Sequence, residues 1–461
     1  MMNKARLTSG PILGSLVAFS LPMVVINLLQ LLFHTADTAV LGMMSGDAEV
    51  AAVGACGSLI SVLVCLVSGY STAANVVISR RVGSRDREGA RRATGTALVL
   101  GLLSGLILMA VVLLLSRRFL ILTNCQPEVL DMADLYMKIY FLGMSITMLY
   151  NFTASILRAS GDSLRPMIHM MVAGVANVGL NVLFVGVIRL TVAGVALATV
   201  LSNLIALVLA LVALARNRDY CKVEKRNLRL RRQELLEMIG IGFPSCIGGL
   251  AFYFGEVAVV SAVNSLGTDA MTANAISSQL DRLNYTVGSS IASAIGVMIS
   301  QNFGAQRFDR VKRTVIIGML YCVAVSMLIG IGVVALSTPL IGIFTDSDAV
   351  LHLTKQRLVL VCLTNFITCA MEVLLNAVRA LRRPRCVLVV GLLCGFLIRS
   401  LWAWVVWPSH KTISFLFVCL PLSTFVGSII YLFVYRDAIK KETTHDEEDY
   451  AASTAQTFEK V

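Results

Sequence analysis

Residues 94–115 read TGTALVLGLLSGLILMAVVLLL, a stretch without a charged side chain that lies between Arg91-Arg92 and Arg117-Arg118. About 20 consecutive apolar residues are enough for one helix to cross the hydrocarbon core of a membrane. Similar apolar runs occupy most of the remaining chain. Together they are 12–43, 50–79, 94–115, 132–157, 167–188, 191–215, 236–264, 270–300, 314–336, 356–379, 386–407 and 411–435. We therefore predict an all-α polytopic membrane protein with twelve transmembrane helices.

The composition agrees with this fold class. Of the 461 residues, 57% are hydrophobic and 14% are charged, whereas a soluble domain carries about 25% charged residues. Most of the surface is therefore expected to face lipid, with no room for a large soluble domain. The net charge of +12 comes from short basic clusters between apolar runs, which argues against nucleic acid as a partner.

The basic clusters also predict an orientation. The segment 80–93 holds six arginines and 216–235 holds eight basic residues, whereas 44–49 and 265–269 hold none. Loops rich in Lys and Arg face the cytoplasm. We expect the chain in the cell inner (plasma) membrane, with both termini and the 216–235 segment in the cytoplasm.

The two halves of the chain repeat each other. Leu157-Arg158-Ala159 matches Val378-Arg379-Ala380 at an offset of 221 residues, and the proline pair Pro22 and Pro244 matches at 222. Six spans in each half make the repeats parallel, and such repeats place a cavity between two lobes. The predicted regions are an N-lobe, a cytoplasmic linker, a C-lobe and a disordered cytoplasmic tail, at 1–215, 216–235, 236–436 and 437–461.

Three motifs carry a family resemblance. They are Leu21-Pro22 followed by Asp37-Thr38-Ala39-Val40-Leu41-Gly42, the segment Arg158-Ala159-Ser160-Gly161-Asp162-Ser163-Leu164-Arg165-Pro166, and Ser300-Gln301-Asn302-Phe303-Gly304-Ala305. In order over 8–436, they resemble the multidrug and toxic compound extrusion (MATE) transporters. The resemblance implies two six-helix lobes around a central cavity. It also implies export of small organic cations in exchange for Na⁺ or H⁺, with no other cofactor.

The first helix carries a polar stripe, Asn27, Gln30, His34 and Asp37, at spacings of three, four and three. These spacings place the side chains on one helical face. We predict that Asp37 is the ion-coupling residue, because a buried carboxylate can bind Na⁺ or a proton. The resemblance implies the same role, since the coupling aspartate of one family branch matches Asp37.

Asn177 and Asn181 lie one turn apart in the fifth span and can share a ligand. The family resemblance implies that they do so beside Asp37. In that family branch the second of these positions is an acid. Asn181 can coordinate Na⁺ through oxygen but cannot hold a proton. A structural hydrogen-bonding role for all three residues stays open at this point.

Further polar side chains inside apolar runs are candidates for the substrate cavity. They are Gln30, His34, Asn151, Glu256, Asp281, Glu372 and Arg399. A buried guanidinium needs an acidic partner, and we expect Glu372, or failing that Glu256, to neutralise Arg399. For the acids, the competing interpretation is an ion pair with Arg282 or Arg399. An unpaired Arg399 would favour an anionic substrate.

Pro22 and Pro244 are predicted helix kinks that can bend during gating. The function predicted here is secondary active export of drugs or organic cations by alternating access between the lobes of a monomer. The alternative is a flippase for lipids or lipid-linked oligosaccharides with the same architecture. We find no HExxH, GxSxG or P-loop motif, so an enzyme is not expected.

Overall fold

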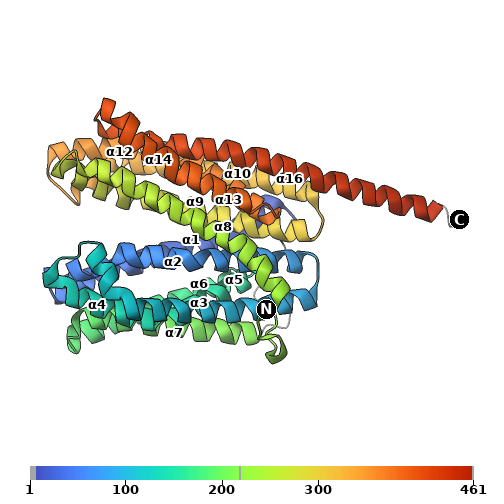
Figure 1. Ribbon diagram of the computed structural model, residues 1–461, viewed down its shortest axis with the longest axis horizontal. Coiled ribbons are helices and arrows are strands. Elements are labelled where there is room, and N and C mark those ends of the chain that lie inside the picture. The colour runs from blue at the N-terminus through green and yellow to red at the C-terminus, as the bar shows by residue number, and fades with distance from the viewer. Residues whose placement is uncertain (1–6, 217–219, 459–461) are drawn as a thin grey trace. The chain divides into compact units, whose positions relative to one another are not determined.

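A computed structural model describes residues 7–216 and 220–458, with side chains except at 34, 36, 38, 39, 47, 225 and 445–458. Within these ranges the secondary structure is helical (Figure 1). The chain divides into two compact units, each described by itself below. Unit 1 comprises the described part of Val17–Cys246, and unit 2 comprises Leu7–Leu16 and the chain from Ile247 onward.

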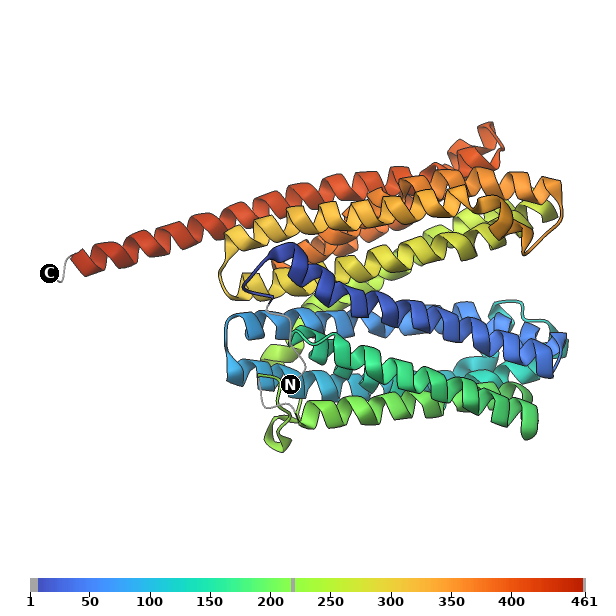
Figure 2. The same ribbon diagram turned by 180° about the vertical axis from the view of Figure 1, so that it is seen from behind.

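Unit 1 is a helical bundle. Its helices are α1 (Ile12–Met44, from Val17 on), α2 (Asp47–Gly83), α3 (Arg87–Leu122), α4 (Pro127–Leu142), α5 (Met144–Ala159), α6 (Leu164–Asn181) continued by η1 (Val182–Val187), α7 (Thr191–Ala215) and η2 (Lys225–Asn227). α5 packs between α3 and α7, and α6 runs along α7 (Figure 2). Gly105 permits the close approach of α3 to α5, because a Cβ atom there would lie 2.5 Å from the Cα atom of Ser145.

The fourth predicted span is bent. Instead of one straight helix over 132–157, the structure has α4 and α5, which meet at Gly143 with an angle of 46°. Eleven described helices are long and apolar enough to cross a membrane, and the bent pair counts as a twelfth span. The predicted fold class is therefore confirmed.

Unit 2 repeats the order of unit 1. Its helices are α8 (Arg232–Asn264, from Ile247 on), α9 (Thr268–Gly304), α10 (Phe308–Ala335), α11 (Ser337–Gly342), α12 (Asp348–Ala380), α13 (Arg385–Val390), η3 (Gly391–Leu397), α14 (Ile398–Leu401), η4 (Trp402–Val406), η5 (Trp407–Ser409), α15 (Ile413–Phe417) and α16 (Cys419–Phe458). α12 packs against α9, α10 and α16. Unlike its repeat partner α4–α5, α12 is one continuous helix.

The predicted disordered tail at 437–461 differs from the structure. α16 continues as a helix to Phe458, beyond the other helices of unit 2 (Figures 1 and 2). Ala438 and Ile439 are still buried, and Lys441 forms an ion pair with Asp437 at 3.0 Å, one turn away. Packing and charge pairing thus continue the helix past the end of the apolar run, as far as Lys441.

The beginning of each first helix groups with the other unit, since Leu7–Leu16 belongs to unit 2 and α8 up to Cys246 belongs to unit 1. In unit 2, the Arg307 side chain donates a hydrogen bond to the carbonyl oxygen of Thr8 at 2.6 Å, and Asn302 donates to that of Leu7 at 3.0 Å. In unit 1, the first turns of α8 are bound through two glutamates. The units therefore depart from the predicted lobes, which place residues 7–16 in the N-lobe and begin the C-lobe at 236.

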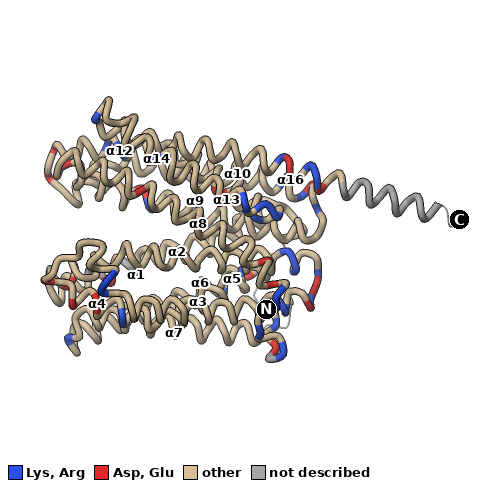
Figure 3. Tube along the Cα trace, viewed as in Figure 1, with Lys and Arg blue, Asp and Glu red and all other residues tan. Residues whose placement is uncertain are grey.

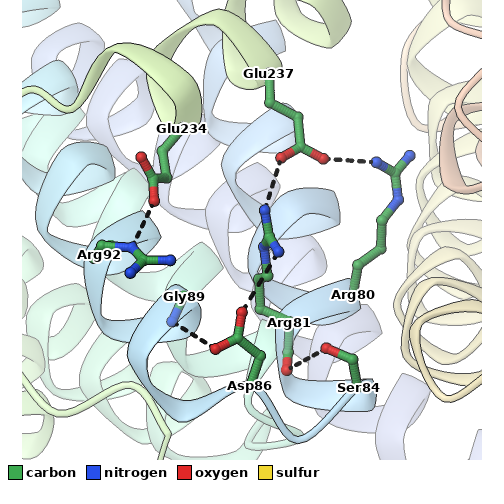
Figure 4. A network of polar contacts seen from close by, with 8 residues as sticks. All are labelled: Arg80, Arg81, Ser84, Asp86, Gly89, Arg92, Glu234 and Glu237. Atoms are coloured by element: carbon green, nitrogen blue, oxygen red, sulfur yellow. Dashed lines mark hydrogen bonds and ion pairs between the residues drawn. The ribbon is translucent and has the colours of Figure 1, made fainter.

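Figure 4 shows how α8 is bound in unit 1. Glu237 pairs with Arg80 at 3.1 Å and with Arg81 at 3.6 Å, and Glu234 pairs with Arg92 at 2.9 Å. Within the predicted linker, residues 217–219 lie outside the described part of the chain. The remainder follows the same surface, where Glu224 pairs with Arg91 at 3.0 Å.

Candidate functional site

Charged residues lie mainly near the two ends of the helices in each unit, and the middle is largely uncharged (Figure 3). One exception in unit 1 is Asp37, at the junction of α1, α6 and α7. Its Oδ1 atom accepts a hydrogen bond from Nδ2 of Asn181 at 2.5 Å. Thr199 donates to its Oδ2 atom at 3.5 Å. We call Asp37, Asn177, Asn181 and Thr199 the Asp37 cluster.

Asn177 and Asn181 contact each other as the sequence predicts. Nδ2 of Asn181 also donates to Oδ1 of Asn177 at 3.2 Å. Asn181 is fully buried and Asn177 is 4% exposed. The Oδ1 atom of Asn181 is buried and has no hydrogen-bond partner among the described residues. An amide oxygen without a donor, beside a carboxylate, is a suitable ligand for a hard cation.

Thr199 is a cluster member that the sequence analysis missed. It lies in the strongly apolar run of α7, four residues before Asn203, whose Nδ2 atom donates to Oγ1 of Thr147 on α5 at 3.1 Å. The sequence signal that could have identified Thr199 was its spacing of four residues from Asn203 within an otherwise apolar helix.

The other unit 1 candidates are less closely associated with the cluster. Gln30 is exposed on α1, and Asn151 is half-buried on α5, where its carbonyl oxygen accepts a hydrogen bond from Ser71 at 3.2 Å. The side chain of His34 lies outside the described residues. No hydrogen bond described for Gln30 or for the Asn151 side chain joins either residue to Asp37.

Arg399 in unit 2 has an acidic partner, but the expected first choice was wrong. Its Nη1 atom lies 3.4 Å from Oε2 of Glu256, and its Nε atom donates to Ser423 at 3.2 Å. The guanidinium also lies over the ring of Phe252, 5.0 Å from the centroid. Because Arg399 is paired, it no longer favours an anionic substrate.

Glu372, which we expected to bind Arg399, instead accepts a hydrogen bond from the hydroxyl of Tyr285 at 3.4 Å. The two residues face each other from α12 and α9. The helical stripe along α12 correctly indicated that Glu372 lies on a polar face. It could not indicate which neighbouring helix supplies the partner.

Asp281 is also paired differently from the expectation. Its partner is Arg357 on α12, at 3.0 Å, and neither Arg282 nor Arg399. Arg357 is 2% exposed, lies 4.5 Å from the ring centroid of Phe417 and contacts the hydroxyl of Ser277. The sequence analysis missed Arg357, although it lies eight residues before Asn365 and so continues the same helical stripe.

Pro22 and Pro244 both lie inside continuous helices, α1 and α8. Pro244 immediately precedes the boundary between the units at Cys246 and Ile247. Before that boundary, α8 packs tightly on α2. A Cβ atom on Gly69 would lie 2.6 Å from the sulfur of Cys246. A bend at Pro244 would therefore fall where α8 passes from one unit to the other.

Comparisons with known proteins agree with this architecture. The chain is 25% identical over 360 residues to the probable multidrug resistance protein YoeA of Bacillus subtilis, covering 77% of this chain and 78% of that protein. It is 23% identical over 351 residues to the multidrug export protein MepA of Staphylococcus aureus, with coverages of 74% and 76%. A solved MATE structure in the straight conformation superposes with a TM-score of 0.89 at 18% identity, covering 96% of this chain and 100% of that one.

A sequence model of the MatE family matches residues 22–183 and 244–405, one match in each half of the chain. Both matches begin at the proline of the first helix of a repeat. Together they span most of the membrane helices in both units. The chain is therefore a multi-pass membrane protein that belongs to the MatE family, whose members are transporters and not enzymes.

Proposed function

We propose that this protein is a secondary active exporter. It moves small organic cations, including drugs, out across the inner (plasma) membrane in exchange for Na⁺ or H⁺ that binds at the Asp37 cluster. Both termini face the cytoplasm, and the monomer works by alternating access. The observation that carries the proposal is the half-buried carboxylate of Asp37 beside the unpartnered Oδ1 atom of Asn181, which is buried.

The chemistry of the cluster suits a small exchangeable cation. Na⁺ prefers oxygen ligands, and the cluster offers the carboxylate of Asp37, the amide oxygens of Asn177 and Asn181, and the hydroxyl of Thr199. A proton would bind Asp37 alone, because an amide does not hold a proton near neutral pH. Either ion cancels the charge of one carboxylate, so the cluster accepts one monovalent cation per cycle.

Unit 2 supplies the acids proposed to face the organic cation. Of the three candidate acids in the spans of unit 2, Asp281 and Glu256 pair with arginine, and Glu372 accepts a hydrogen bond from a tyrosine. The side chain of Glu256 is 49% exposed although it pairs with Arg399. Counted with their partners Arg357 and Arg399, the three candidate acids carry a formal net charge of −1, which favours a cationic substrate over an anionic one.

The test is efflux of a cationic dye from proteoliposomes in which Na⁺ and pH gradients are imposed separately. One gradient alone should drive wild-type efflux. Asp37→Asn should abolish at least nine-tenths of the gradient-driven efflux while the protein still elutes as a folded species in detergent. Asp131→Asn is the matched control, because Asp131 pairs with Arg117 outside the cluster at 2.7 Å. Full coupling in Asp37→Asn would refute the proposal.

A further inference from the structure

The turns that connect α5 to α6 in unit 1 and α12 to α13 in unit 2 have the same backbone form. Gly161 has φ 85° and Arg382 has φ 59°, and the two residues are 221 positions apart. The next residue closes each turn, since the amide of Asp162 donates to Leu157 and that of Arg383 donates to Val378, both at 3.1 Å. The repeat therefore places arginine where its counterpart has glycine.

Arginine at this position is conformationally unfavourable. Positive φ is the left-handed region, which glycine adopts freely and a side chain with a Cβ atom adopts at a cost. Arg85 and Gln306 adopt the same conformation in other turns, with φ of 58° and 55°, so the conformation alone assigns no function, and a role for Arg382 depends on the charges around it. The same turn would be less strained with the glycine that unit 1 uses.

The turn of unit 2 also lacks the acidic residue that forms favourable contacts in the turn of unit 1. In unit 1, Asp162 accepts a hydrogen bond from the amide of Arg165 at 3.1 Å and pairs with its side chain at 3.2 Å. The turn of unit 2 instead contains three exposed arginines, Arg382, Arg383 and Arg385. Among the described side chains, no Asp or Glu forms an ion pair with any of the three.

The basic segment 80–93 of unit 1 differs from this turn, because several of its arginines have acidic partners. There, Arg80, Arg81 and Arg92 are neutralised by the glutamates of α8 (Figure 4). Figure 3 shows basic residues gathered at the beginning of α13 in unit 2. This turn presents positive charge that the described part of the protein does not neutralise.

An exposed apolar stripe continues from the turn along the span. Val389, Leu392 and Phe396 are 56%, 47% and 38% exposed, and they follow Arg385 at spacings of four, three and four. Val389 lies on α13, and Leu392 and Phe396 lie on the π-helical segment η3 that continues it, so the three exposed side chains follow the span away from the turn. A cationic end and an apolar flank are the two surfaces that a phospholipid contacts with its headgroup and its acyl chain.

We propose that Arg382, Arg383 and Arg385, together with the stripe Val389, Leu392 and Phe396, bind an anionic phospholipid. The phosphate lies against the guanidinium groups, which suit phosphate oxygens because their donors are arranged in a planar fork. An acyl chain lies along the stripe. This site does not depend on the transport proposal, since it shares no residue with the Asp37 cluster.

The test is lipid retention measured by native mass spectrometry on the full-length protein. The purified protein is mixed with equal amounts of phosphatidylglycerol and phosphatidylcholine, and inorganic phosphate is added in a separate arm. Wild type should retain phosphatidylglycerol preferentially. The triple variant Arg382→Gln, Arg383→Gln, Arg385→Gln should lose retention by about fivefold per arginine. Millimolar inorganic phosphate should not displace the lipid, because it lacks the acyl chain.

The matched control removes three other exposed arginines with Arg85→Gln, Arg216→Gln and Arg229→Gln, and should keep the preference. Equal loss in this control, or no preference in wild type, would overturn the site in favour of unspecific charge attraction. Displacement by inorganic phosphate would overturn the role of the lipid. A single Arg382→Gly variant keeps the test independent of folding. It should melt no lower than wild type in phosphatidylcholine while retaining less phosphatidylglycerol.

Discussion

Asp37 in unit 1 and Asp281 in unit 2 are both acids inside long helices, but their described surroundings differ in charge. Asp37 accepts hydrogen bonds from the amide of Asn181 and the hydroxyl of Thr199, whereas Asp281 pairs with the guanidinium of Arg357 at 3.0 Å. Neutral donors orient a carboxylate and leave its charge for an exchanging ion. A guanidinium neutralises it permanently. The comparison teaches that an acid in a membrane helix predicts ion exchange only when its partners are known.

The largest expected effect comes from breaking the buried pair of unit 2. Arg357→Leu leaves the carboxylate of Asp281 without its counter-charge, which should lower stability by about 3–5 kcal/mol. Thermal unfolding in detergent measures the change. Adding Asp281→Asn should recover most of the loss, and Arg282→Leu, at an exposed position, should have little effect. Equal losses in the single and double variants would show that the pair is not the cause.

Breaking the Arg399 pair should cost less. Glu256 is 49% exposed, so after Arg399→Leu water can solvate much of its charge, and a loss of about 1–3 kcal/mol is expected. Adding Glu256→Gln should restore part of the stability, whereas adding Glu372→Gln should not. Rescue by Glu372→Gln would return Glu372 to its originally expected role. The same unfolding experiment distinguishes the two partners.

Removing a neutral hydrogen-bond donor from the Asp37 cluster in unit 1 should weaken ion binding more than it lowers stability. Thr199→Val removes the hydroxyl contact to Asp37 and should weaken ion binding by about 0.5–1.5 kcal/mol, or roughly two- to tenfold. The concentration of coupling ion that gives half-maximal efflux measures this change. Thr199→Ser keeps the hydroxyl and serves as the control. An unchanged ion requirement in Thr199→Val would remove Thr199 from the cluster.

The smallest expected effect is that of membrane potential on the efflux of a monovalent cationic dye. One carboxylate in the Asp37 cluster predicts the exchange of one monovalent ion for one monovalent organic cation, which moves no net charge. Each net charge moved through 100 mV would otherwise contribute about 2.3 kcal/mol, or about a fiftyfold concentration ratio. Dye efflux from vesicles clamped with valinomycin at a fixed ion gradient should therefore change little with voltage. A steep dependence would require a second ion, for which the acids of unit 2 are the candidates.

The internal repeat preserves the backbone of one turn but not its side chains. An offset of 221 residues places Gly161 and Arg382 in the same left-handed turn, so the backbone is shared between the units. The charges on that turn are not shared. At this turn the repeat thus preserves the backbone conformation and not the charges, because a side chain can diverge without altering the turn.

The sequence by itself determined the membrane class, the twelve spans in two repeats, and Asp37 with Asn177 and Asn181 as neighbours. The membrane class and the spans depend on apolar length and on charge between the spans, and the one-turn spacing of Asn177 and Asn181 lies within one helix, so these features are local. The place of the two asparagines beside Asp37 was implied by the family resemblance. Only the tertiary structure decided that Thr199 joins Asp37, that Glu256 and not Glu372 binds Arg399, and that Arg357 holds Asp281. Spacing along a helix tells which side chains share a face. Which face meets which neighbour depends on how the helices rotate and pack against one another, and the residues of one helix do not determine this.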